Sequence, residues 1–277
     1  MLNVSSPIVS VEWLSKNLNQ PNLIVFDATI QKVTDKSSTN DNLSYIKNAL
    51  FFDIKKEFSV QGAAFPNTML TAKEFQEKAR SYGVHNDSCI VVYDRYGYYS
   101  CARVWWMFKS MGFENIAVLD GGLPAWNEGK LPIQNKADTA IEKGDFIAKY
   151  KPGMIHDHVP VLKAIDDSGI GIIDARGSSR FNALVEEPRP GLRSGHIPNS
   201  KNLPYTDLLD GVKMKSENEL KTLFDDIYNK QIIFSCGSGI TACILALGAE
   251  IAGIENKSVY DGSWTEWGSL TDLPIEK

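Results

Sequence analysis

Cysteine is scarce in this chain, long apolar runs are missing, and positive charge does not predominate. The 277 residues contain four cysteines, and no two of them form a C-x-x-C pair of the kind that binds zinc. So few cysteines cannot provide the disulfide framework of a small secreted protein. We therefore expect reduced thiols and no zinc site.

The lack of apolar and basic segments excludes further classes of partner. No stretch approaches the roughly 20 apolar residues that span a membrane. Residues 1–7 show neither the basic nor the apolar part of a secretory signal. The net charge of −5 has the wrong sign for binding a nucleic-acid backbone. We therefore expect a cytoplasmic protein that binds neither nucleic acid nor a membrane.

What the chain does contain is an internal repeat. Residues 91–126 align with residues 232–267 without a gap, at a constant offset of 141. Each copy alternates short apolar segments with helical patterns, which favours an α/β fold with a mostly parallel sheet and helices on both faces. Repeats of this size indicate a duplicated domain rather than a solenoid. We predict domains at residues 1–135 and 152–277, joined by a polar surface connector.

In the second copy an apolar segment ends at a cysteine. Residues 232–235 have the pattern of a buried strand, Cys236 follows, and residues 241–250 have the pattern of a helix. A loop between a strand and a helix N-terminus directs backbone N–H groups inward at the positive end of the helix dipole. Gly237 and Gly239 allow the loop to curl around a sulfur atom. Thiols at such places ionise readily, so Cys236 is the predicted nucleophile, the alternative being a plain buried cysteine.

The run C-G-S-G-I-T-A at residues 236–242 resembles the active-site loop of the rhodanese-like sulfurtransferases. It is most similar to the CGSGVTA loop of the 3-mercaptopyruvate sulfurtransferases. Thiosulfate sulfurtransferases usually carry CRKGVTA, whose two cationic residues have no counterpart here. The resemblance implies that Cys236 carries a sulfane sulfur as a persulfide and that Ser238 takes part in catalysis. The other implied loop residues are Gly237, Gly239, Ile240 and Thr241.

The resemblance covers nearly the whole chain and implies two tandem rhodanese-like domains, the first inactive and the second catalytic. At the 141 offset Cys236 falls on Arg95, so the first copy has no nucleophile in its loop. The family also has a first-domain H-I-P-G-A motif, whose histidine has been proposed to form a proton relay with the loop serine. This chain has Tyr45 at that histidine, which leaves the existence of a relay open.

Several arginines of the second copy lie in segments that resemble the R-F and E-P-R motifs of the family. The resemblance implies that Arg180 and Arg189 hold the carboxylate and keto oxygen of the substrate. The guanidinium fork suits this role because it grips a planar carboxylate through two parallel hydrogen bonds. Arg176 and Arg193 are expected to be structural. Tyr99, in a segment similar to G-x-Y-S-A-P-R, is a further substrate-facing candidate, with core packing as the alternative.

These implications favour an enzyme that moves a sulfane sulfur from 3-mercaptopyruvate through a Cys236 persulfide to cyanide or a thiol, such as thioredoxin or glutathione. Such a reaction needs no metal and no organic cofactor. The alternatives are a thiosulfate sulfurtransferase that uses the same persulfide, and a non-catalytic rhodanese-like binding module. A cysteine phosphatase of related fold is disfavoured, because its C-x5-R motif needs an arginine where Ala242 stands. A Cys–His pair is disfavoured too, because the family uses the histidine at His196 structurally.

Overall fold

The computed structural model describes residues 1–33, 44–139 and 142–277, and these fall into two compact units. The first unit comprises Met1–Ser59, Met69–Tyr150 and Gly211–Lys213, and the second comprises Val60–Thr68, Lys151–Asp210 and Met214–Lys277. Each unit thus takes a short segment from the half of the sequence that otherwise builds the other unit. Within the described ranges, no helix is long and apolar enough to cross a membrane.

The first unit contains a five-stranded parallel sheet with the strand order β1-β6-β5-β2-β4. Its β5 and β6 strands are buried at every position, as is usual when helices cover both faces of a parallel sheet. The elements of this unit are β1 (Ile8–Val9), α1 (Val11–Asn17), β2 (Leu23–Asp27), β3 (Tyr45–Ile46), β4 (Ala49–Phe51), α2 (Ala72–Ser81), β5 (Cys89–Tyr93), α3 (Cys101–Ser110), β6 (Ile116–Leu119), α4 (Gly122–Glu128) and β7 (Ile133–Gln134).

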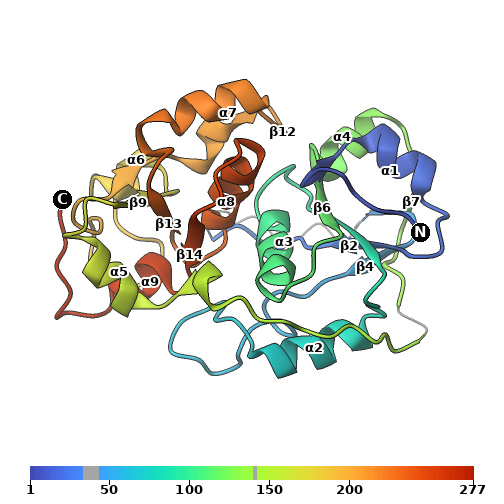
Figure 1. Ribbon diagram of the computed structural model, residues 1–277, viewed down its shortest axis with the longest axis horizontal. Coiled ribbons are helices and arrows are strands. Elements are labelled where there is room, and N and C mark those ends of the chain that lie inside the picture. The colour runs from blue at the N-terminus through green and yellow to red at the C-terminus, as the bar shows by residue number, and fades with distance from the viewer. Residues whose placement is uncertain (34–43, 140–141) are drawn as a thin grey trace. The chain divides into compact units, whose positions relative to one another are not determined.

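Alternate side chains of β2 show how the first sheet is covered. Val25 belongs to the apolar cluster of one face, together with Leu14 of α1 and Trp126 of α4. Phe26 points to the opposite face, where its ring stacks with Phe108 of α3 at 6.2 Å between centroids. Successive residues of a strand face opposite sides of a sheet, so one short apolar strand serves both cores. Helices therefore lie on both faces (Figure 1).

The second unit repeats this plan with the order β10-β9-β13-β14-β8, all parallel. This confirms the predicted class of two α/β domains with parallel sheets. The remaining elements of the chain are η1 (Pro152–Met154), β8 (Ile155–His156), α5 (His158–Ala164), β9 (Ile170–Asp174), α6 (Ser178–Phe181), β10 (Lys201–Asn202), η2 (Tyr205–Leu208), β11 (Leu209–Asp210), β12 (Lys213–Met214), α7 (Glu217–Leu223), η3 (Asp225–Ile227), β13 (Gln231–Ser235), α8 (Ala242–Ile251), β14 (Lys257–Tyr260) and α9 (Ser263–Trp267).

Apolar side chains also pack on both faces of the second sheet. Ile233 of β13 packs in one cluster with Val161 of α5 and Trp264 of α9. The next residue, Phe234, faces the other side, where its ring meets Phe224 after α7 edge-on at 6.1 Å. Because β13 is buried on both faces, its carboxyl end is held rigidly. That end carries Cys236.

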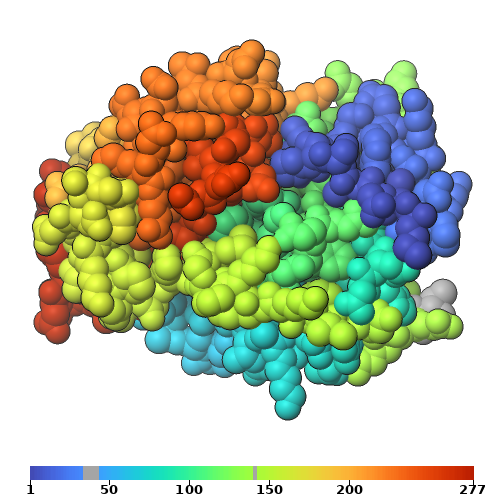
Figure 2. Space-filling view, viewed as in Figure 1, coloured from blue at the N-terminus to red at the C-terminus, as the bar shows by residue number. Residues whose placement is uncertain are grey.

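The part of the polar connector that follows residue 141 forms no helix and no strand before residue 152. Residues 144–150 run over the surface of the first unit, where they appear in yellow-green in Figure 2. They are held by backbone bonds, in which the N–H groups of Gly144, Phe146 and Lys149 donate to carbonyls of the first unit. These bonds give an otherwise unstructured stretch a fixed course.

The sheet registers correct the ungapped alignment of the two copies. In the first sheet Ile116 of β6 pairs with Ile90 of β5, and in the second sheet Lys257 of β14 pairs with Ile232 of β13. Ile116 and Lys257 correspond at the 141 offset. Ile90 and Ile232 do not correspond at that offset, because β13 is displaced by one residue. The loop after β5 is therefore one residue longer than the loop after β13.

This shift changes which residue of the first unit corresponds to the cysteine. The backbone N–H of Leu123 donates to the carbonyl of Asp94, and the N–H of Trp264 donates to the carbonyl of Cys236. Leu123 and Trp264 do correspond at the 141 offset. Cys236 thus takes the place of Asp94, and the alignment of Cys236 with Arg95 was wrong.

Candidate active site

Cys236 lies immediately after β13, and only 1% of its surface is exposed. The hydroxyl of Ser263, at the start of α9, accepts from the N–H groups of Cys236 at 3.1 Å and Gly239 at 3.2 Å. The same hydroxyl donates to the Tyr260 carbonyl at 2.7 Å. One buried side chain thus pins both ends of the loop that carries the cysteine.

Helix α9 also fixes the direction of the loop carbonyls. The N–H groups of Trp264 and Thr265 donate to the carbonyls of Cys236 and Gly237, each at 2.9 Å. The Thr265 hydroxyl donates to the Gly237 carbonyl as well. Helix α9 thus holds these carbonyls. Five backbone N–H groups of the loop have no hydrogen-bond acceptor among the residues that the structure describes. They belong to Gly237, Ser238, Ile240, Thr241 and Ala242.

The first unit shows what such a set of N–H groups binds. The Oδ2 atom of Asp94 accepts from the backbone N–H groups of Tyr99 at 2.7 Å, Ser100 at 2.8 Å and Cys101 at 3.0 Å. Its Oδ1 atom accepts from the N–H of Tyr96 at 2.9 Å. Loop amides before a helix N-terminus hold a negative charge in this way. We call this set of loop N–H groups the N–H cradle. In the first unit the carboxylate of Asp94 occupies the cradle, whereas the second unit has Cys236 at the place of Asp94.

Arg180 lies directly beside the cysteine loop. A Cβ atom built on Gly237 would lie 3.2 Å from Nη2 of Arg180. The carboxylate of Glu187 holds the guanidinium, with distances of 3.2 Å to Nε and 2.5 Å to Nη2. Arg180 remains 20% exposed, and its Nη1 has no acceptor among the described residues. An anion at the loop can therefore reach this guanidinium.

Arg189 reaches the same loop from the other predicted motif. Its Nη2 donates to the hydroxyl of Ser238 and its Nη1 to the hydroxyl of Thr265, both at 3.3 Å. A Cβ atom on Gly237 would lie 3.9 Å from Nη1. The structure therefore brings Arg180, Arg189, Ser238 and Cys236 together in the second unit, while their roles in substrate binding and catalysis stay predictions.

The other two arginines of this segment hold the fold. Arg176 is buried, and its guanidinium binds Asp174 and Glu187 while lying 4.4 Å from the Trp264 ring centroid. Among the described residues, Arg193 donates only to backbone carbonyls, which belong to residues 267, 268, 270 and 273. These contacts confirm that both residues are structural.

His196 is structural as well. Its Nδ1 lies 2.9 Å from the Phe181 carbonyl, to which it donates, and its ring stacks on that of Phe181 at 3.9 Å between centroids. Backbone bonds in both directions join His196 to Glu276. The imidazole therefore supports the segment that follows the E-P-R motif and is not paired with the cysteine.

The remaining cysteines lack the features of a nucleophile. Burial raises the pKa of Cys89 to about 11 and raises the pKa of Cys101 well above its usual value. The thiol of Cys243 donates to the Gly239 carbonyl at 3.3 Å. Within the described ranges, no three His, Cys, Asp or Glu side chains gather as a metal site would require.

Two further residues named from the sequence belong to the first unit. The Tyr99 ring packs edge-on against Tyr96 at 5.8 Å, with the amine of Lys32 at 5.4 Å from its centroid. The Tyr45 ring lies 4.7 Å from the guanidinium of Arg95. A contact of Tyr99 with the substrate stays a prediction. Tyr45 has a cation partner within its own unit.

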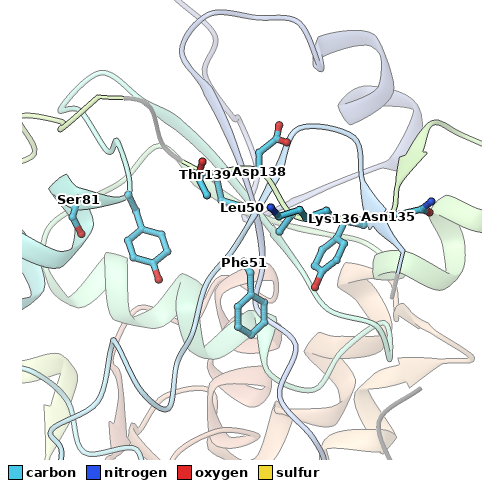
Figure 3. Close-up of a pocket in the computed structure, with 10 residues that line it drawn as sticks. Leu50, Phe51, Ser81, Asn135, Lys136, Asp138 and Thr139 are labelled. Carbon is cyan, nitrogen blue, oxygen red and sulfur yellow. The ribbon is translucent and has the colours of Figure 1, made fainter. Parts of the chain in front are cut away.

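A surface pocket of about 570 Å³ also lies in the first unit. Figure 3 shows it between β4, which carries Leu50 and Phe51, and the segment after β7 that carries Lys136, Asp138 and Thr139. Its lining includes no cysteine and no arginine. It therefore lacks the groups that the sequence associates with sulfur transfer.

Sequence reasoning missed three residues that organise the site. Glu187 orients Arg180, Thr265 joins Arg189 to the loop, and Ser263 pins the loop itself. Glu187 could have been found as the acid of the E-P-R triplet. No sequence signal marks Ser263: it aligns with Gly122 of the first copy, and the positive φ angles of 49° and 53° that the two residues share are visible only in the structure.

Comparison with known proteins identifies the family. A model of the rhodanese-like domain matches residues 10–129 and again residues 159–270. The chain belongs to the rhodanese-like family. The two matches correspond to the two rhodanese-like units of the fold.

Named relatives cover nearly the whole rhodanese-like chain. A mitochondrial thiosulfate/3-mercaptopyruvate sulfurtransferase of Arabidopsis thaliana is 38% identical over 99% of this chain and 79% of its own. A 3-mercaptopyruvate sulfurtransferase of Escherichia coli K12 is 36% identical over 97% of both chains. The crystal structure of SseA from Escherichia coli, described as a 3-mercaptopyruvate sulfotransferase, matches with a TM-score of 0.83 at 32% identity, over 94% of this chain and 99% of that one. The chain is thus a sulfurtransferase of this family.

Replacing Ser263 with alanine should impair both stability and activity. The change leaves the buried N–H groups of Cys236 and Gly239 without their acceptor, and each unpaired buried group costs about 1–3 kcal/mol. We expect a lower melting temperature and a kcat/KM at least about tenfold lower in a sulfurtransferase assay, which equals ~1.4 kcal/mol. Ser263→Gly is the matched control, because glycine loses the same hydroxyl but accepts the positive φ. Ser263→Gly should have a higher melting temperature than Ser263→Ala, and its kcat/KM should be lowered equally. Normal activity in both variants would refute the role of the hydroxyl.

Proposed function

We propose that the protein moves a sulfane sulfur from 3-mercaptopyruvate, through a persulfide on Cys236, to a thiol acceptor. One observation carries the proposal. Cys236 takes the place at which Asp94 presents a carboxylate to four backbone N–H groups. A cysteine persulfide would present its terminal, negatively charged sulfur to the equivalent groups. Relatives named as 3-mercaptopyruvate sulfurtransferases support the choice of donor.

The first half-reaction needs only a thiolate and a proton. The Cys236 thiolate attacks the sulfur of mercaptopyruvate, a sulfur–sulfur bond forms, and the carbon–sulfur bond breaks. The bonding electrons pass to carbon as the enolate of pyruvate. The hydrogen of the donor thiol ends on that carbon, so pyruvate leaves and the enzyme keeps an anionic persulfide. Both halves of the reaction balance without a cofactor.

The surrounding side chains match the charges that this step creates. Mercaptopyruvate brings a carboxylate, which suits the guanidinium of Arg180 or Arg189 beside Gly237. Negative charge grows on the keto oxygen as the carbon–sulfur bond breaks. The hydroxyl of Ser238, which is 7% exposed beside the same loop, is the proposed donor to that oxygen.

In the second half-reaction a thiol attacks the terminal sulfur and carries it away, which restores the Cys236 thiolate. Such a two-step transfer has ping-pong kinetics. Thioredoxin, glutathione and cyanide are the proposed acceptors. The cytoplasmic location also stays a proposal, and the Arabidopsis thaliana relative is named as mitochondrial.

Thiosulfate is the second candidate donor, because the Arabidopsis thaliana relative is named for both substrates. The loop supplies no cation of its own at Gly237 or Ser238. The two guanidinium groups near Gly237 belong to other segments, where Glu187 and Thr265 anchor them. A non-catalytic module is the less favoured reading, since Cys236 and its N–H cradle are intact.

Cys236→Ser should abolish sulfur transfer without unfolding the protein, because a serine hydroxyl is not ionised near neutral pH. The matched control is Cys243→Ser, a buried cysteine that bonds the same loop. It should keep substantial turnover, as should Cys89→Ser and Cys101→Ser. Pyruvate release from mercaptopyruvate measures the effect. Turnover by Cys236→Ser would overturn the proposed nucleophile.

Arg180→Ala and Arg189→Ala should each lower kcat/KM for mercaptopyruvate by roughly tenfold to a hundredfold, because a hydrogen bond to a charged group is worth about 1.5–3 kcal/mol. Arg→Lys should recover only part of the loss, since lysine lacks the planar fork. Steady-state kinetics with a fixed acceptor concentration measures both. If neither alanine variant differs from the unaltered protein, the arginines do not bind the substrate.

The donor preference should favour mercaptopyruvate. We expect its kcat/KM to exceed that of thiosulfate by at least about tenfold, or ~1.4 kcal/mol of differential transition-state binding. The reason is that thiosulfate carries its charge next to the reacting sulfur, where the loop offers neutral groups only. Side-by-side assays with one acceptor test this ratio. Equal values would refute the specificity while leaving the persulfide mechanism in place.

A further inference from the structure

A segment from the first half of the sequence belongs to the catalytic unit. Residues 60–68 group with the second unit, and the N–H of Val60 donates to the Thr68 carbonyl at 2.9 Å, which closes the segment into a loop. Asn67 in this loop is 7% exposed and has a φ of 64°. Asparagine is one of the few residues that tolerates this left-handed backbone. The loop therefore buries one polar side chain in a defined orientation.

The Asn67 side chain contacts the serine of the cysteine loop at two points. Its Nδ2 donates to the backbone carbonyl of Ser238 at 3.2 Å and to the Ser238 hydroxyl oxygen at 3.1 Å. The carbonyl fixes the orientation of the amide, because a carbonyl oxygen only accepts hydrogen bonds and would repel the amide oxygen. Asn67 therefore presents a donor to the hydroxyl.

This contact determines what the Ser238 hydroxyl can do. A hydroxyl has one hydrogen to donate and two lone pairs that accept. Asn67 Nδ2 donates to the oxygen from one side and Arg189 Nη2 donates to it from another, at 3.3 Å. Neither partner nitrogen can accept a hydrogen bond. The hydroxyl hydrogen is left, and no acceptor for it is found among the described residues.

We propose that Asn67 is a positioning residue that, with Arg189, occupies both lone pairs of Ser238 and so aims the serine hydroxyl hydrogen at the reacting substrate. The inference rests on the proposed function, in which that hydrogen stabilises charge on the keto oxygen of the sulfur donor. It adds that Asn67, in the loop at residues 60–68, is what sets this donor role of Ser238.

Two substitutions at Asn67 separate the role of its hydrogen-bond donor from the role of its side-chain shape. Asn67→Gly keeps the positive φ and removes the amide, and it should lower kcat with mercaptopyruvate about tenfold, or ~1.4 kcal/mol, with KM within about twofold. Asn67→Asp keeps the shape but replaces the donor with an oxygen that repels the Ser238 carbonyl and captures the hydroxyl hydrogen. It should be impaired at least as strongly as Asn67→Gly. Thr68→Val, which loses only a bond to the Phe65 carbonyl in the same loop, should keep normal kcat.

A double-mutant cycle with Ser238→Ala makes the test specific. Once the hydroxyl is gone, Asn67→Gly should change kcat by less than about twofold, because the two residues act through one interaction. The inference is overturned if Asn67→Gly turns over normally, if Asn67→Asp is close to the unaltered protein while Asn67→Gly is not, or if the losses simply add. Failure of the proposed function itself would be seen separately, as an absence of pyruvate release by the unaltered protein.

Discussion

The site depends on a set of backbone N–H groups that are kept available because α9 binds the carbonyls of the same loop. Ser263 pins the loop at Cys236 and Gly239, and the first turn of α9 binds the carbonyls on the far side. The N–H groups of five loop residues are then left without an acceptor among the described residues, next to the residue that carries the thiol. Backbone groups fixed in this way need no reorganisation when charge develops, which is the most effective form of electrostatic stabilisation. Arg180, Arg189 and Ser238 supply further hydrogen-bond donors beside the same loop.

The two copies of the domain use the same cradle in opposite ways. In the first, Asp94 supplies a permanent carboxylate, so the N–H groups are already bonded to the chain. In the second, the residue at that place is Cys236, whose side chain would acquire and release a charged sulfur in the proposed reaction. The second unit also differs in its arginine segment, where Glu187 holds Arg180 at the loop. Duplication therefore kept the scaffold, and the difference in function lies in a few side chains around one loop.

Much of this was predictable from local patterns in the sequence. The apolar segments and the strand–CGSG–helix run identify the parallel sheets and the cysteine loop, since strand and helix periodicity are local properties. The alignment of Cys236 with Arg95 failed because a single additional loop residue leaves the flanking helices in register and shifts only the strand. Asn67 could not have been found, because nothing in the sequence shows that residues 60–68 join the second unit. The hydroxyls of Ser263 and Thr265 bond backbone groups of the loop, and contacts with the backbone leave no motif in the sequence.

The most direct test of this account is the mass of the intact protein after incubation with 3-mercaptopyruvate in the absence of an acceptor. The account predicts a gain of one sulfur atom per chain, located by peptide mapping on Cys236. Addition of a thiol should remove it and regenerate the original mass, and Cys236→Ser should show no gain. An unchanged mass, or a sulfur carried on Cys89, Cys101 or Cys243, would contradict the claim that the second cradle holds a persulfide.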